Sequence, residues 1–229
     1  MRWMQIGLLS MLLFFSFLNT YCQQNKPIQI SFRPVFGKED IDMENASQKG
    51  GDTTVFETVR FYVSNLQLMN DNKVVYSERN SVHLLDGVDS NSLQILLPVP
   101  GEMAYNKLQF NIGIDSTTNV SGALGGDLDP TKGMYWTWQS GYINVKVEGR
   151  NPICSSPGHA FQFHLGGYQN PYNSLQRVGV GLRKKRTVIL LDMKRFMQHI
   201  DLSKQHHLMS PGEEAVRLSG IFAKCFRTK

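Results

Sequence analysis

Apolar and polar residues alternate along most of this chain, and that alternation limits the folds available to it. In residues 141–149, Ile143, Val145 and Val147 alternate with Asn144 and Lys146. Successive side chains of an extended strand point to opposite faces, so a period of two predicts a strand with one buried face. The pattern predicts a protein built from half-buried β-strands.

The same pattern recurs about nine times, between turns rich in Gly, Asn, Asp and Pro. The predicted strands are residues 28–32, 59–68, 73–78, 81–86, 93–98, 107–115, 141–149, 160–166 and 186–193. No helices alternate with them, which favours an all-β antiparallel β-sandwich with long loops. Because hydrophobic residues make up 41% of the chain, one sizeable core is expected.

Helix signals gather near the C-terminal end. The sequence Ser210-Pro211-Gly212-Glu213 offers an N-cap serine, a proline at the first helical position and a glutamate three residues after the cap. It predicts a short C-terminal helix, and a second short helix is predicted near residues 193–201.

The first 22 residues are typical of a secretory signal peptide. One basic residue, Arg2, precedes the apolar run GLLSMLLFFSFL at 7–18, which a polar exit follows. This run is shorter than the roughly 20 apolar residues of a transmembrane helix. Cys22 raises the alternative of a lipoprotein, although Tyr21 is bulky where small residues are expected. We therefore expect an exported soluble protein, periplasmic or extracellular, with one domain over residues 23–229.

Charge and cysteine content exclude some functions. The formal net charge is +5, with a dense basic run, RKKR, at 183–186. No aromatic residues are interleaved with this run, so we expect a solvated turn and no nucleic-acid partner. Cys154 and Cys225 stand outside any CxxC motif, which excludes a zinc ribbon or a thioredoxin site. Whether these two thiols pair stays open at this stage.

Two tryptophans stand two residues apart in GMYWTWQSGY, at 133–142. If this stretch is extended, Trp136 and Trp138 share one face. They are then core residues, a stacking platform for a ligand, or part of a metal site. An indole donates one hydrogen bond and accepts none, so unmodified tryptophan is not a metal ligand.

Three histidines are further candidates. His164 lies in the predicted strand 160–166 on the face opposite its large apolar residues, and His83 is placed likewise in SVHLLD. His159 follows SSPG in a predicted loop. Histidines that converge bind copper or zinc, but no pair here has HxH or HxxxH spacing, so structural and metal-binding roles both stay open. No GxSxG elbow supports a hydrolase.

Several segments together resemble one known family. They are RFYVSNLQL, SVHLLDGVDSNS, LQFNIGIDSTTN, GALGGDLDPTKGMYWTWQSGYINVKVEG and FQFHLGGY, in this order. They are similar to the MbnP-like family of exported copper-binding proteins, in a form like that of Bacteroidetes, over roughly residues 28–200. The most specific matches are GMYWTWQSGY and FHLGG.

The resemblance implies a periplasmic or surface β-sandwich that handles copper and is not an enzyme. In such proteins, copper is held by two histidines and by a kynurenine made by oxidising a tryptophan. The oxidant is a partner diheme cytochrome-c-type peroxidase (MbnH-like). Matching positions in this chain are Trp136, Trp138 and His164, with His83 as first choice and His159 as second choice for the other histidine. The rival expectation is a non-catalytic binding module without metal, in which the tryptophans are core or a ligand platform.

Overall fold

The computed structural model describes residues 26–43, 54–182 and 186–229, and the expected signal peptide and most of the basic run lie outside these ranges. The strands are β1 (Lys26–Phe36), β2 (Glu39–Asp40), β3 (Val55–Asn70), β4 (Lys73–Ser77), β5 (Val82–Asp86), β6 (Gln94–Val99), β7 (Lys107–Ile112), β8 (Tyr135–Trp136), β9 (Gly141–Arg150), β10 (Ala160–Gly166), β11 (Gln176–Gly181), β12 (Arg186–Asp192), β13 (His207–Leu208) and β14 (Phe226–Thr228). All nine predicted strands are therefore present, and the all-β prediction is confirmed.

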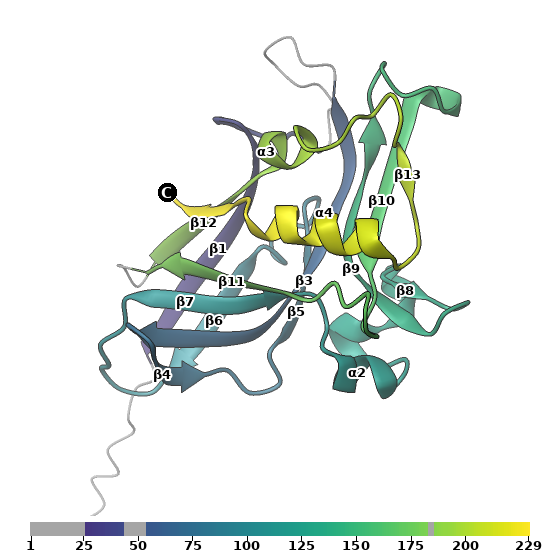
Figure 1. Cartoon of the computed structure of the whole chain (residues 1–229). Helices are drawn as coiled ribbons and strands as arrows, with labels where there is room; N and C mark the ends of the chain where they lie inside the picture. Colours follow the sequence, from purple (N-terminus) through teal and green to yellow (C-terminus); the bar gives the residue numbers. More distant parts are fainter. Residues whose placement is uncertain (1–25, 44–53, 183–185) are drawn as a thin grey trace, which may run out of the picture.

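The strands form two sheets (Figure 1). The smaller has the order β14-β12-β1-β2, with β6 also paired to β1. The larger has nine strands in the order β11-β7-β3-β9-β10-β13, and β4 and β5 pair with β3 while β8 pairs with β9. The pairing is antiparallel except for β1 with β12 and β10 with β13. Long stretches of chain separate both parallel pairs, as a parallel connection requires.

The two sheets face each other across one large apolar core. Phe32 of the small sheet contacts Phe61 and Phe110 of the large sheet edge to face, with ring centroids 6.2 and 5.5 Å apart. The residues predicted to point inward, such as Val145, Val147 and Phe163, are fully buried there. The sandwich therefore follows from the alternation, since each sheet covers the apolar face of the other.

Helices close the sandwich at one side. α4 (Glu213–Ala223) packs on β10 and β11, and α3 (Met193–Met197) packs on β1 (Figure 1). Both helices were predicted, but α4 begins later than its sequence indicated, because its N-cap is Gly212 and Ser210 makes no cap. Asp192 caps α3 by accepting a hydrogen bond from the backbone N–H of Arg195.

A second, smaller layer covers the outer face of the large sheet. The long loop between β7 and β9 folds into α2 (Ser116–Val120), two 3-10 turns, η1 (Gly126–Leu128) and η2 (Pro130–Lys132), and β8. Its apolar residues form a cluster separate from the main core: Tyr62, Leu84, Ile114, Leu128, Met134, Trp136, Tyr142 and Ile143. This loop explains why Asn144, on the predicted polar face of β9, is 1% exposed. The side-chain amide of Asn144 accepts a hydrogen bond from the backbone N–H of Ile114 and donates one to Oγ of Ser174, both at 2.9 Å.

Cys154 and Cys225 are both buried and both free. Among the described residues, no helix is long and apolar enough to cross a membrane.

Candidate metal centre

The tryptophan stretch folds as a tight hairpin. Trp136 pairs with Gly141 and Tyr135 with Tyr142, so the chain reverses through residues 137–140, with Ser140 at φ 51°. The stretch is therefore not extended throughout, and the prediction that Trp136 and Trp138 share a strand face does not hold. The two indoles still lie close together, with ring centroids 5.9 Å apart. Trp136 is 5% exposed, whereas Trp138 is 65% exposed.

The indole of Trp136, a residue of β8, packs against the backbone of β10 at Gly166. A Cβ added at Gly166 would come within 2.6 Å of Cζ3 of Trp136, so only a glycine accommodates the indole at this distance. The ring belongs to the outer cluster, together with Tyr142 and Met134. Its Nε1–H is buried and has no hydrogen-bond partner among the described residues. A buried donor without a partner is uncommon and calls for an explanation.

His164 stands two residues before Gly166 on the same strand. The prediction that it points away from the core is correct, but the residue is 4% exposed. Its Nε2 lies 2.7 Å from Oε1 of Glu148, on the adjacent strand β9. Its Nδ1 is buried and, within the described part of the chain, has no partner. The buried ring nitrogens of His164 and Trp136 are thus both unpaired.

Glu148 stays ionised beside this histidine. The hydrogen bond from His164 is the main reason that the pKa of the Glu148 carboxyl falls to about 2 from its ordinary 4.5, against the opposing effect of burial. Lys146, whose Nζ lies 3.8 Å from Oε1, acts in the same direction. Glu148 was not among the residues predicted from the sequence. Its position two residues after Lys146 on the polar face of β9 is the only sequence signal.

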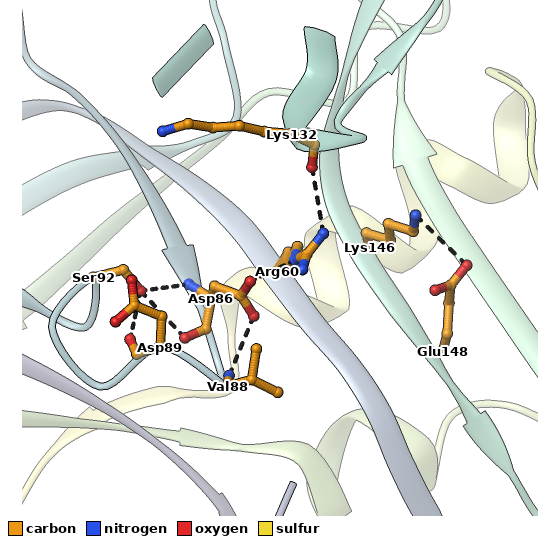
Figure 2. Close-up of polar contacts among 8 residues, drawn as sticks. All are labelled: Arg60, Asp86, Val88, Asp89, Ser92, Lys132, Lys146 and Glu148. Atoms are coloured by element: carbon orange, nitrogen blue, oxygen red, sulfur yellow. Dashed lines mark hydrogen bonds and ion pairs between the residues drawn. The ribbon is translucent and has the colours of Figure 1, made fainter. Parts of the chain in front are cut away.

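A row of charged residues crosses the outer face of the large sheet toward His164 and Glu148. Residues that are partners across neighbouring strands share one face of a sheet. On this face, Asp86 of β5 is paired with Arg60 of β3. Arg60 is paired in turn with Lys146 of β9, and Lys146 with His164 of β10. Arg60 Nε lies 2.6 Å from Asp86, and Arg60 Nη1 donates to the carbonyl of Lys132 (Figure 2). A cleft of about 550 Å³ lies at the Asp86 end, and its lining includes Arg60, Asp86 and Lys132.

The structure does not bring His83 to His164. His83 is on β5, and β3 and β9 lie between β5 and β10. Three strand spacings separate the two backbones by about 14 Å. The His83 ring is engaged elsewhere, with Nε2 2.8 Å from Oε2 of Glu78.

His159 is also remote from His164. It ends η3 (Pro157–His159), immediately before β10, and its Nδ1 lies 2.9 Å from the carbonyl oxygen of Cys154. The residues from Ala160 to His164 are extended, so at least about 13 Å of strand separates the two histidines.

The structure places a different histidine beside β10. His207 of β13 pairs with Gln162, on the edge of β10 away from β9, and shares the face of His164. β13 has only two residues and no alternation, which is why it was not predicted. Over the described ranges, no group of three or more His, Cys, Asp or Glu side chains is arranged to hold a metal ion. A site of three ligands within these ranges would need a donor of another kind.

Comparison with known proteins agrees with this fold. A family model described as MbnP matches residues 25–211. Among solved structures, MbnP from Methylosinus trichosporium is similar, with a TM-score of 0.56 and 18% identity over 78% of this chain and 79% of that chain. At that identity the likeness concerns the fold. No curated protein matches the sequence. Since the family model covers most of the chain, this protein is a member of the MbnP family.

Proposed function

We propose that this protein is an exported copper-binding protein that acts in copper acquisition or handling, as a carrier and not as an enzyme. Copper is the cargo in this proposal. One observation supports it most: His164 of β10 and Trp136, which packs on Gly166 of that strand, each keep a buried ring nitrogen without a partner among the described residues. Membership of the MbnP family supports the choice of metal.

His164 fits a copper ligand. A neutral imidazole nitrogen suits copper, and Nδ1 of His164 is a ring nitrogen that no described protein group occupies. The surroundings are dry, since His164 is 4% exposed. A ring nitrogen is a donor that a borderline or soft metal takes, whereas hard cations prefer oxygen ligands.

Trp136 is proposed as the source of the second nitrogen donor. With two equivalents of peroxide as the oxidant, cleavage of its Cγ–Cδ1 bond puts one oxygen on Cγ as a ketone and one on Cδ1 as an N-formyl group, and releases two waters. Hydrolysis then removes Cδ1 as formate, and Nε1 becomes the aromatic amine of kynurenine, with a lone pair. Nε1 of Trp136 is the nitrogen already left unpaired in the outer cluster, whereas Trp138 is mostly exposed. We therefore assign the modification to Trp136 and its oxidation to a diheme cytochrome-c-type peroxidase partner.

His207 is a better candidate than His83 or His159 for a second imidazole. It is offset from His164 by one strand and two residues, which corresponds to about 8 Å between Cα atoms. Its side chain is exposed, so the ring is free to turn toward His164.

Metal analysis and intact mass of protein purified from its native host test the proposal. We expect copper at one equivalent together with the mass change from tryptophan to kynurenine. Protein made without the oxidase serves as the control and should lack both. Host-produced protein with neither copper nor the modification would contradict the proposal.

The alternative is a binding module without metal. The observation that favours it is the exposed face of Trp138, which stands 5.9 Å from Trp136 and offers an aromatic surface for stacking. In that case host-produced protein contains unmodified tryptophan and no copper.

A further inference from the structure

We propose that Glu148 is a positioning residue for the copper site: it holds His164 in the tautomer protonated on Nε2, so that Nδ1 is the atom offered to the metal. This inference rests on the proposed function. It adds Glu148 as a positioning residue and names Nδ1 of His164 as the ligand atom.

The hydrogen bond between the two side chains fixes the tautomer. An ionised carboxylate only accepts hydrogen bonds, and a neutral imidazole carries one N–H. With Nε2 of His164 2.7 Å from Oε1 of Glu148, the N–H must be on Nε2. The lone pair is then on Nδ1, the atom that is buried and has no partner among the described residues.

The carboxylate is itself held in place. Glu148 is paired with Gln162 across β9 and β10, while His164 is paired with Lys146, so the two side chains meet on a diagonal of one regular ladder. The amide of Gln162 lies 3.5 Å from the same oxygen, and Nζ of Lys146 lies 3.8 Å from it. The ring of His164 therefore has one orientation set before any metal arrives.

This arrangement is the one that metal-binding histidines use. Such a histidine commonly donates its second ring N–H to a carboxylate or carbonyl, and loss of that partner lowers metal affinity by roughly 10- to 100-fold. Glu78 with His83 is a second carboxylate–histidine pair, at 2.8 Å, but that ring is 27% exposed. It provides a matched control within the same chain.

The tautomer is testable without copper. In the metal-free, full exported chain, ¹⁵N NMR of the imidazoles above the titration range should show His164 Nδ1 as a pyridine-type nitrogen and Nε2 as a pyrrole-type nitrogen. The opposite assignment overturns the inference. This measurement uses the wild-type chain and does not depend on how any variant folds.

The positioning role is tested by competition for Cu(I) with a chromogenic chelator, on host-produced protein. We expect Glu148→Gln to weaken Cu(I) binding by about 10- to 100-fold, and Glu78→Gln to leave it unchanged. If the wild type binds Cu(I) but Glu148→Gln binds equally well, the inference fails while the proposed function stands. If the wild type binds no Cu(I), the proposed function fails and the metal-directed role of Glu148 fails with it.

Discussion

The indole of Trp136 lies against the backbone of Gly166, where a Cβ would come within 2.6 Å of Cζ3. That Cβ would also lie 2.8 Å from the carbonyl oxygen of Tyr142, so residues of both β8 and β9 contact Gly166. The contact sets how deeply the tryptophan sits in the outer cluster.

Gly166→Ala should therefore displace Trp136. The added methyl group would meet both the indole and the backbone carbonyl oxygen of Tyr142, so the ring and the adjoining β9–β10 backbone have to shift. Such overpacking costs about 1–3 kcal/mol, which urea unfolding measures as a lower free energy of unfolding. Tryptophan fluorescence should shift to the red as the ring meets water.

Gly181→Ala is the matched control for that variant. Gly181 ends β11, and a Cβ there meets nothing within 4 Å. Equal destabilisation by both substitutions would show that loss of glycine in a strand, and not the contact with Trp136, causes the effect.

Acid should destabilise the protein through Glu148. The folded pKa, about 2, lies below the ordinary 4.5, so the ionised carboxylate stabilises the folded state fully above pH 4.5. This contribution is lost as pH falls from 4.5 toward 2, and its size is at most about 3 kcal/mol. We expect the free energy of unfolding to fall more steeply over that window for the wild type than for Glu148→Gln. Parallel curves for the two proteins would contradict the assignment.

The core of the sandwich could be predicted from sequence because it depends on local alternation. Val145, Val147 and Phe163 are buried where a period of two places them. The short strands β8, β13 and β14 have too few residues for any period to be detected, and their places are set by tertiary contacts. The burial of Asn144 was missed for the same reason, since a loop distant in sequence covers it.

The candidate site was only partly predictable. Trp136 and His164 lie on β8 and β10, which both pair with β9, and the segments GMYWTWQSGY and FHLGG had singled out these two residues. The choice between His83, His159 and His207 depended on strand order. Strand order is a property of the whole fold, so no local pattern could have separated β5 from β10 or placed β13 beside it.

His164→Ala should reduce copper affinity by more than the roughly 10- to 100-fold expected for losing an outer partner. The fold should persist, because the core contacts of β10 come from Phe161, Phe163 and Leu165. Chelator competition measures the affinity, and circular dichroism checks the fold. His83→Ala is the control and should bind copper as the wild type does. If His83→Ala alone loses copper, the site lies at β5 instead.

Substitution of the two tryptophans should show which one is oxidised. Trp136 is buried against Gly166 of β10 and its Nε1 has no partner in the described part of the chain, whereas Trp138 is 65% exposed and lies on the turn of the hairpin. We expect Trp136→Phe, made in the native host, to abolish both the kynurenine mass change and copper binding. Trp138→Phe should keep the modification on the peptide that contains residue 136, as peptide mass spectrometry would show. A kynurenine found at 138 in the wild type would reverse the assignment and move the nitrogen donor to the exposed side of the hairpin.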